Sequence, residues 1–300
     1  MTARAAIHDA PGLEAYLAEL EDCLDHAVAS HRGVVAEVGG EALAAGGKRL
    51  RPLLVYLTAP ERPPAIEAGV AVELVHMATL MHDDLIDGAR VRRGRASAWS
   101  AYGPRAARAT GDYLFARAFA EIARTRNARA VSILADATLC LARGEAMQRS
   151  QRHDANTTVE AYLERCALKT GKLFEAACRL ADGSGAFGLA LGIAFQITDD
   201  ILDCAGVTFE TGKISGTDLR EGTPTLPLLL AAARDDAVRQ ALAGGPLVDG
   251  VLLRIASTGA LEESRRVALA YARSACACLN GELHRDELES LTHAIVDRDH

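Results

Sequence analysis

The spacing of apolar residues is the feature that most restricts the fold of this chain. Apolar residues recur every three or four positions along most of its 300 residues, alanine and leucine dominate, and β-branched and aromatic runs are scarce. This period is typical of amphipathic α-helices, whereas half-buried strands would alternate strictly. The sequence therefore predicts an almost wholly α-helical fold without strand signals.

Clusters of glycine and proline divide this helical pattern. They occur at Gly39-Gly40, Gly46-Gly47, residues 60–64, Gly103-Pro104, residues 183–185, residues 206–222 and residues 244–246. Such residues end helices, so we expect roughly ten or more of them. Hydrophobic residues make up 49% of the chain, and no change of composition marks a linker. We therefore predict a single domain over residues 1–300, an all-α bundle around a central cavity.

Charge and composition exclude several partners and locations. A net charge of −7 argues against a nucleic-acid surface, and seven scattered cysteines are typical of reduced thiols. The N-terminus lacks the apolar core of a signal peptide, and the most apolar stretch, residues 186–197, is too short to span a bilayer. We therefore expect a cytoplasmic protein with no integral membrane segment.

Two acidic segments with the same DDxxD pattern carry the strongest chemical signal. They are Asp83 to Asp87 and Asp199 to Asp203. In a helix, the first and last carboxylates of such a segment lie about 6 Å apart on nearly the same face. One segment could be a solvated surface, but two, each followed by basic residues, indicate matching walls of one cavity. Carboxylates facing a diphosphate would repel it, so a divalent metal must intervene, and Mg²⁺ suits oxygen ligands of this kind.

A glycine turn at residues 46–47 opens onto Lys48 and Arg51. Glycine allows close approach of the backbone to a phosphate, while lysine provides a point charge and arginine a two-pronged donor. Taken alone, the segment could equally be the flank of a helix. Its position shortly before the first acidic segment favours an oxyanion site.

Further cationic or polar residues lie close to the first acidic segment. His76 precedes Asp83 by two helical turns on the same face, and Arg92 and Arg93 follow the segment. Each could be an ordinary core or surface residue, but their grouping favours diphosphate binding. His82, directly before Asp83, leaves open a metal phosphohydrolase of the HD type, although that alternative does not explain the second acidic segment.

Several motifs in this order resemble the trans-polyprenyl diphosphate synthases. The likeness runs from about residue 40 to residue 230. Its motifs are Gly46 to Pro52, His82 to Asp87, Arg92 to Gly94, Lys169-Thr170, Phe195 to Asp203, Gly212-Lys213 and Gly216 to Gly222. Together they are far more specific than any one alone. The resemblance implies a fold of the isoprenoid synthase type, Mg²⁺ as the cofactor and a homodimer.

The resemblance also implies roles for individual residues. Isopentenyl diphosphate would bind to Lys48, Arg51, His76 and Arg93. Mg²⁺ on the allylic diphosphate would be held by Asp83, Asp87, Asp199 and Asp203, and the catalytic set would be Asp83, Asp87, Lys169 and Asp199. The rest of the allylic site would be Arg92, Lys169, Thr170, Gln196 and Lys213.

At two positions the sequence departs from the family pattern. Ala96 replaces a common proline, and Thr223 replaces a common lysine. The second change removes one expected cation, so the allylic site would depend more on Lys213 or Lys172.

The implied reaction is the head-to-tail condensation of isopentenyl diphosphate with an allylic diphosphate, giving an all-trans polyprenyl diphosphate. Bulk four or five positions before Asp83 would stop chain growth, and the small Thr79 and Ala78 stand there, so the wall is open at this depth. The resemblance favours the long-chain branch, with products beyond C20. Phe115 and Phe119 are candidates for the floor of the tunnel or ordinary core aromatics. The alternatives are a short-chain geranylgeranyl or farnesyl diphosphate synthase, a terpene cyclase, and a non-catalytic synthase subunit.

Overall fold

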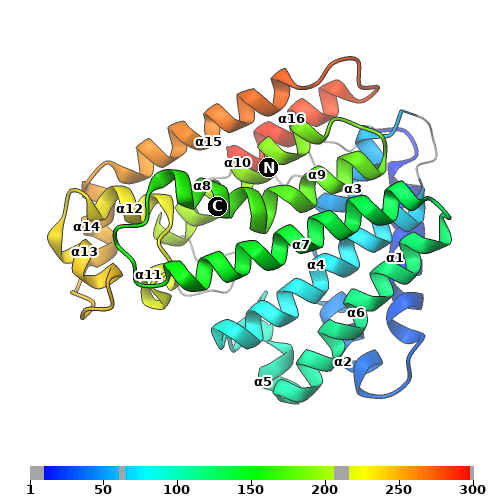
Figure 1. Ribbon diagram of the computed structural model, residues 1–300, viewed down its shortest axis with the longest axis horizontal. Coiled ribbons are helices and arrows are strands. Elements are labelled where there is room, and N and C mark those ends of the chain that lie inside the picture. The colour runs from blue at the N-terminus through cyan, green and yellow to red at the C-terminus, as the bar shows by residue number, and fades with distance from the viewer. Residues whose placement is uncertain (1–9, 61–64, 206–215, 298–300) are drawn as a thin grey trace.

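The computed structural model describes residues 10–60, 65–205 and 216–297 (Figure 1). Its first half contains α1 (Leu13–Ala29), α2 (Val34–Ala44), α3 (Leu50–Thr58), α4 (Ile66–Asp87), β1 (Val91–Arg92), β2 (Arg95–Ala96), α5 (Ala98–Tyr102), α6 (Pro104–Arg124) and α7 (Ala128–Gln151). Its second half contains α8 (Val159–Cys166), the π-helix η2 (Ala167–Gly171), α9 (Lys172–Leu180), α10 (Gly185–Ala205), α11 (Thr217–Glu221), α12 (Leu226–Ala232), α13 (Asp236–Leu242), α14 (Val251–Ser257), α15 (Ala260–Ala277) and α16 (Arg285–Val296). The predicted all-α bundle is confirmed, with one addition, a two-stranded antiparallel hairpin formed by β1 and β2.

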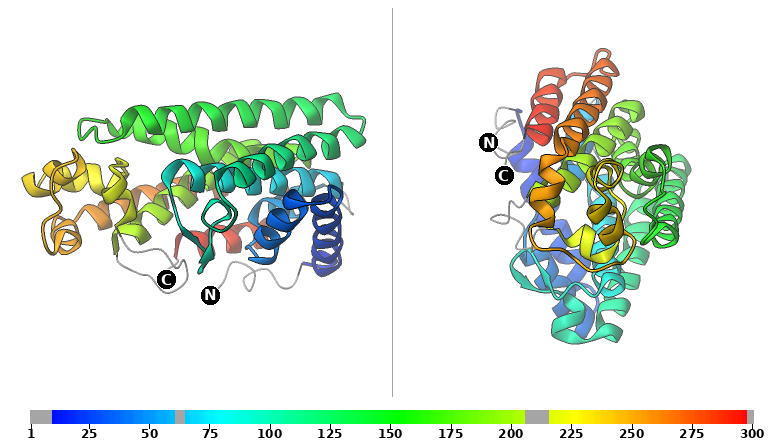
Figure 2. Two further views of the ribbon diagram at one scale, coloured as in Figure 1. Left: turned by 90° about the horizontal axis from the view of Figure 1, so that it is seen from below. Right: turned by 90° about the vertical axis from the view of Figure 1, so that its left-hand side faces the viewer.

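The two helices that carry the acidic segments lie inside the bundle. The first, α4, packs along α6 and α3, and the second, α10, packs along α9 and α15. In both views of Figure 2, α7 runs along an outer edge of the molecule. Long helices packed side by side therefore enclose α4 and α10, and the ends of both that bear aspartates lie near α8 and α11 (Figure 1).

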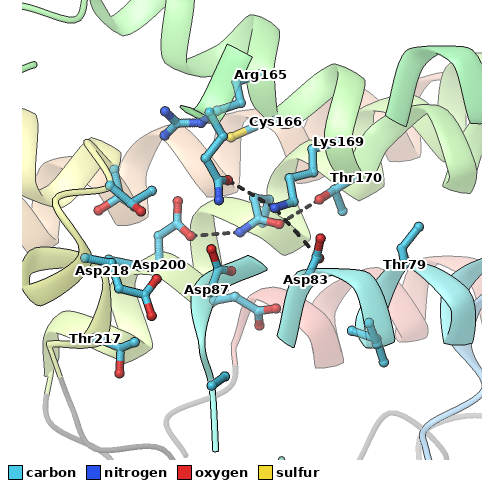
Figure 3. Close-up of a pocket in the computed structure, with 18 of the residues that line it drawn as sticks. Thr79, Asp83, Asp87, Arg165, Cys166, Lys169, Thr170, Asp200, Thr217 and Asp218 are labelled. Carbon is cyan, nitrogen blue, oxygen red and sulfur yellow. Dashed lines mark hydrogen bonds and ion pairs between the residues drawn. The ribbon is translucent and has the colours of Figure 1, made fainter. Parts of the chain in front are cut away.

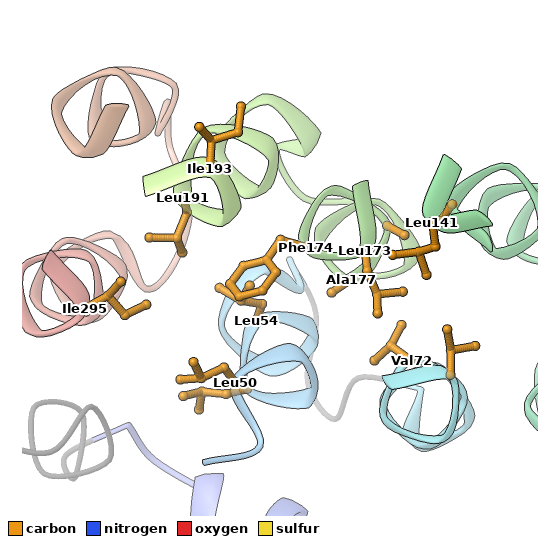
Figure 4. Close-up of a cluster of buried hydrophobic side chains, with 14 of the residues drawn as sticks. Leu50, Leu54, Val72, Leu141, Leu173, Phe174, Ala177, Leu191, Ile193 and Ile295 are labelled. Atoms are coloured by element: carbon orange, nitrogen blue, oxygen red, sulfur yellow. The ribbon is translucent and has the colours of Figure 1, made fainter. Parts of the chain in front are cut away.

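Apolar side chains from helices far apart in the sequence form one continuous buried cluster. In its centre the ring of Phe174 on α9 points toward Leu54 on α3 (Figure 4). Both side chains are fully buried. Burying a side chain of this size stabilises the fold by about 1.5–3 kcal/mol, so this contact fixes α3 and α9 against each other.

Most glycine clusters lie between helices, as predicted, but Gly39-Gly40 was wrongly assigned as a helix break. Both residues lie inside α2. A Cβ atom on Gly39 would lie 2.8 Å from Cγ1 of Val28, so this glycine lets α2 approach α1 closely. Close packing between helices uses glycine without ending either of them.

By length and composition, α10 is the one helix in the described ranges that could cross a membrane. More than half of its most apolar stretch is buried inside the molecule, and its C-terminal part carries the second acidic segment. Buried core helices of globular proteins have the same composition. The packing of α10 against α9 and α15 agrees with the prediction of a core helix.

The contact between α10 and its neighbours on η2 and α9 gives a test of the packing. A Cβ atom on Gly192 would lie 2.7 Å from Cα of Gly171 and 3.1 Å from Cβ of Phe174. Gly192→Ala is therefore expected to lower the free energy of unfolding by about 1–3 kcal/mol, measured by denaturant titration.

Gly40→Ala is the matched control for Gly192→Ala. Nothing lies within 4 Å of a Cβ atom on Gly40, and the residue is inside α2. Alanine there should raise the free energy of unfolding by up to about 1 kcal/mol because it favours the helix. Equal effects of the two substitutions would contradict the close packing of α10.

Candidate active site

A cavity of about 620 Å³ opens between the helices that carry the acidic segments (Figure 3). Side chains from α3, α4, α8, η2, α10 and residues 217–225 line it. The residues predicted from the sequence that line it are Arg51, His76, Asp83, Asp87, Arg92, Lys169, Thr170, Gln196 and Asp199. The fold therefore brings both acidic segments and most of the predicted cations to one cavity.

Three predicted site residues lie elsewhere, and a fourth is not among the described residues. Lys48 is exposed before α3, and Arg93 lines a second cavity, which shares His76 and Arg92 with the first. The carboxylate of Asp203 accepts hydrogen bonds from the backbone N–H groups of residues 217 and 218, at 3.1 and 3.0 Å. Lys213 lies outside the described residues. The roles of these four remain predictions.

Within the first acidic segment, the carboxylates divide between the cavity and the protein interior. Asp83 and Asp87 line the cavity, whereas Asp84 is buried. The guanidinium of Arg92 binds both oxygens of Asp84, with Nε at 2.8 and 2.7 Å. Burial raises the pKa of Asp83 to about 6. The nearby charges of Glu145 and Asp87 also raise this pKa, whereas the charge of Lys169 lowers it. Negative charge is therefore crowded at this wall, where a bound cation would stabilise it.

The second acidic segment repeats this division. Asp199 lines the cavity, and Asp200 is buried. Asp200 accepts a hydrogen bond of 2.6 Å from the Tyr162 hydroxyl and one of 2.8 Å from Nε2 of Gln196. Oε1 of Gln196 in turn accepts a hydrogen bond of 2.6 Å from the Thr170 hydroxyl. The second aspartate of each segment thus holds neighbouring side chains in place, although Asp200, unlike Asp84, also lines the cavity.

A π-helix positions the lysine between these walls. Lys169 lies in η2, whose wider turn interrupts the run of helix from α8 to α9, and such turns are frequent at functional sites. Its ammonium donates to Glu145 at 2.7 Å and to Gln148 at 3.2 Å, and lies 3.7 Å from Oδ2 of Asp83. Burial alone would lower the pKa of Lys169, but the carboxylates of Asp83 and Glu145 raise it, so the lysine remains a cation.

Glu145 and Gln148 were missed by the sequence analysis. They lie one turn apart on α7, where a Cβ atom on Gly144 would come within 2.7 Å of the backbone nitrogen of Lys169. Only the close approach of α7 to η2 brings them to the site. A Glu and a Gln at this spacing are common on helix surfaces, so the sequence alone carries no signal for them.

Arg51 and His76 form a separate electropositive wall. The Arg51 guanidinium lies 4.9 Å from the centre of the Phe174 ring, and its buried Nε has no acceptor among the described residues. Burial lowers the pKa of Arg51 to about 10, so it stays charged at neutral pH. Burial and the nearby charges of Arg51 and Arg93 lower the pKa of His76 well below its usual range, which keeps the imidazole neutral. An anion could bind here without competing with a carboxylate for the Nε–H of Arg51.

Arg49, between the two predicted ligands Lys48 and Arg51, anchors the loop instead. Its backbone is in the left-handed region, with φ of 48°. Its side chain donates to Glu21 at 2.7 Å and to the buried Glu73 at 3.0 Å. Breaking a buried ion pair by removing one partner is strongly destabilising, so this pair fixes the conformation from which Lys48 and Arg51 project.

The segment from residue 216 to 225 supplies one end of the cavity. Thr217, Asp218, Arg220, Glu221, Thr223 and Thr225 line it. Asp203 holds the start of this segment, and α7 holds its middle: Arg152 donates to the carbonyl of Glu221, and the His153 backbone N–H donates to the carbonyl of Gly222 at 2.8 Å. The motif at 216–222 was noted in the sequence, but its individual side chains were not assigned.

The carboxylates of the cavity suit a hard divalent cation. Asp83, Asp87 and Asp199 offer only oxygen ligands from two walls. Across the described ranges, no three His, Cys, Asp or Glu side chains converge tightly enough to enclose a metal by themselves. Mg²⁺ usually keeps several waters and binds through one or two carboxylates plus substrate phosphates. The residues therefore fit ions whose coordination is completed by a diphosphate.

The cavity extends along α4 past Asp83. Thr79 and Leu80 line it, whereas Ala78 is fully buried. Phe115 and Phe119 face each other on α6, with ring centres 5.9 Å apart, and neither belongs to the cavity lining. The small side chain of Thr79 leaves space at this depth, and the position of the tunnel floor remains a prediction.

Known proteins with similar sequences and structures share this architecture. Residues 33–244 match the family described as polyprenyl synthetase. The chain is 39% identical over 286 residues to heptaprenyl diphosphate synthase component 2 of Geobacillus stearothermophilus, covering 88% of this chain and 89% of that protein.

Two crystal structures extend the similarity to the fold. Polyprenyl synthase from Caulobacter crescentus CB15, complexed with calcium and isoprenyl diphosphate, superposes with a TM-score of 0.86 at 35% identity, covering 95% of both chains. A decaprenyl diphosphate synthase from Rhodobacter capsulatus gives a TM-score of 0.87 at 32% identity, covering 95% of this chain and 97% of that one. Since the family match spans more than half of the sequence and these relatives cover nearly all of it, the chain belongs to the polyprenyl synthetase family.

Proposed function

We propose that this protein is a Mg²⁺-dependent prenyltransferase that condenses isopentenyl diphosphate head-to-tail with an allylic diphosphate. The observation that carries the proposal is the facing of two acidic segments across one cavity that also contains a separate electropositive wall. Two diphosphates need two such sites. A terpene cyclase, which ionises one diphosphate, would have no use for the wall formed by Arg51 and His76.

In the proposed mechanism, the carboxylates of Asp83, Asp87 and Asp199 would hold Mg²⁺, with Asp203 as a further candidate. When bound, Mg²⁺ would stabilise the negative charge that develops on the departing diphosphate. Lys169, held by Glu145 and Gln148, adds a fixed positive charge beside Asp83. Such preorganised charges lower the barrier because they need no reorientation as the bond breaks.

The second diphosphate would bind at Arg51 and His76, together with Lys48 and Arg93. Its alkene would then lie near the allylic carbon. As the allylic C–O bond breaks, its electron pair leaves with diphosphate. The alkene forms the new C–C bond, and the resulting cation loses a proton to the released diphosphate. No side chain is required as the base.

The first acidic segment gives a direct test. Asp83→Asn should lower kcat by about 100-fold or more, because it removes a charged metal ligand while keeping the shape of the side chain. Diphosphate release from isopentenyl and farnesyl diphosphates in Mg²⁺ measures it, and chelation of the metal should stop the wild-type reaction. Asp22→Asn, on the exposed surface of α1, is the control. Undiminished turnover by Asp83→Asn would contradict the proposed role of Asp83 as a metal ligand.

Long-chain products are the proposed outcome. The relatives named above are heptaprenyl and decaprenyl diphosphate synthases, and Thr79 leaves the cavity open one turn before Asp83. None of the α4 residues that line the cavity is Phe, Tyr or Trp, and the aromatic lining residues Tyr162 and Phe195 come from α8 and α10. A geranylgeranyl or farnesyl synthase would need a barrier at this depth.

Thr79→Phe is expected to shorten the product to C20 or less, since the ring would fill the cavity beside Asp83. Mass spectrometry of the dephosphorylated alcohols measures the change. Thr79→Val, which keeps the volume of the side chain, should leave the product length unaltered. A long-chain product from Thr79→Phe would show that the chain grows along another path.

The outer face of α7 supports the proposed homodimer. Ala135, Leu139, Ala142 and Ala146 follow one another on this face and are all exposed. Leu139 is 63% exposed, which is unusual for a leucine on a long helix. A second copy packed against this face would cover it.

Leu139→Glu should turn the dimer into a monomer, because it would bury a charge in the proposed interface. Light scattering after size-exclusion chromatography measures the mass. Leu253→Glu, at an even more exposed leucine on α14, is the control and should leave the mass unchanged. A dimer that survives Leu139→Glu would require another interface.

The name of one relative, component 2 of a heptaprenyl diphosphate synthase, supports a second candidate, a catalytic subunit that needs another chain. The purified protein alone would then release no diphosphate from isopentenyl and farnesyl diphosphates. Full turnover by the single chain would favour the homodimer instead. For either assembly we propose a cytoplasmic enzyme.

A further inference from the structure

Arg165 on α8 is a buried cation that lines the cavity but has no assigned role. Its residue surface is 4% exposed. The guanidinium donates to the side-chain oxygen of Gln151 and, at 2.7 Å, to the backbone carbonyl of Pro224. Both acceptors are neutral. The guanidinium lies 5.4 Å from the centre of the Tyr162 ring, and it interacts electrostatically with the carboxylate of Asp200, to which it makes no hydrogen bond in the described part of the chain. Buried charges are normally paired.

A second observation concerns Thr225, which follows the proline that Arg165 binds. Thr225 is 2% exposed and lines the cavity, and its buried hydroxyl has no hydrogen-bond partner in the described part of the chain. The hydroxyl makes no capping bond to α12, although Thr225 is the residue before that helix. Buried hydroxyls almost always have partners, so this one points to a ligand atom.

The two residues meet at the turn that separates α11 from α12. Arg165 holds the carbonyl of Pro224, and Thr223 and Thr225 on either side of this proline both line the cavity. Thr223 is the position where the sequence lacks the lysine common in related chains. The Arg165 guanidinium on α8 therefore provides a positive charge next to the turn that has Thr223 in place of a lysine.

We propose that Arg165 and Thr225 form an oxyanion subsite for the diphosphate group bound at the second acidic segment. The inference rests on the proposed function. In this arrangement Arg165 has two tasks: it braces the turn through Pro224, and its remaining N–H groups face the anion together with the Thr225 hydroxyl. Arginine suits both tasks because its donors are fixed in one plane and its charge is permanent.

A purely structural role for Arg165 would predict a different environment. A neutral donor could satisfy the oxygens of Gln151 and Pro224, and it would avoid the cost of burying a charge that is hydrogen-bonded only to neutral acceptors. The presence of the Arg165 charge and the unpartnered Thr225 hydroxyl at one cavity is explained if both bind the same anion. Asp200 attracts Arg165 electrostatically, but its oxygens accept their hydrogen bonds from Tyr162 and Gln196.

The test separates the charge of Arg165 from its bracing of the turn. Arg165→Met should raise KM for the allylic diphosphate about tenfold to a hundredfold and leave KM for isopentenyl diphosphate unchanged. Thr223→Lys in the same chain should restore most of the loss, because it returns a cation without restoring the contact to Pro224. Thr225→Val, which keeps the shape of the side chain, should also raise KM for the allylic substrate only.

Binding of inorganic diphosphate in the presence of Mg²⁺, followed by calorimetry, gives a readout that needs no turnover. Arg165→Met should weaken this binding, and Arg129→Met, which removes an exposed arginine remote from the cavity, should not. A wild-type protein that binds diphosphate but turns over no prenyl substrates would count against the single-chain enzyme proposed above and not against the subsite.

Two results would overturn the subsite itself. One is unchanged diphosphate binding by Arg165→Met. The other is an equal loss for both substrates, with a lower melting temperature and no rescue by Thr223→Lys, which would mean that Arg165 only braces the turn.

Discussion

Crowding of carboxylates in a half-buried cavity is the constraint on which the rest of this structure depends. Aspartates brought together from two helices repel one another, and burial makes that repulsion stronger. Burial is the main cause of the raised pKa of Asp83, and the nearby charges of Glu145 and Asp87 add to it. Every helix near α4 and α10 therefore has to hold these charges in place while leaving room for a cation and its ligand.

The protein meets this constraint by giving the aspartates of each segment different surroundings. Asp84 is tied to Arg92, and Asp200 is tied to Tyr162 and Gln196, so neither adds a free charge to the cavity. Asp83, Asp87 and Asp199 line the cavity, as does Asp200, whereas Asp84 does not. Two identical sequence patterns thus use different partners, an ion pair in one helix and neutral hydrogen bonds in the other, to hold the second aspartate in place.

Local sequence signals were enough to predict the fold class and the core of the site, because they depend on short-range periodicity. Asp83, Asp87 and Asp199 share a cavity, as the helical spacing implied. Glu145, Gln148 and Arg165 could not be predicted, since they reach the cavity only through the packing of α7 and α8. Gly39 was wrongly predicted to end a helix for the same reason. It lies inside α2, and its lack of a side chain serves the close packing against Val28 of α1, which the local sequence does not reveal.

The position of α7 has a mechanical consequence. The helix is about 36 Å long, and its inner side carries the acceptors of Lys169. Arg152 and His153, which follow it directly, donate to the carbonyls of Glu221 and Gly222, and residues on its outer side such as Leu139 are exposed. A rigid helix transmits a push at one point along its whole length. Any molecule that packs against the outer side of α7 is therefore connected, through this one helix, to Lys169 and to the cavity segment at Glu221 and Gly222.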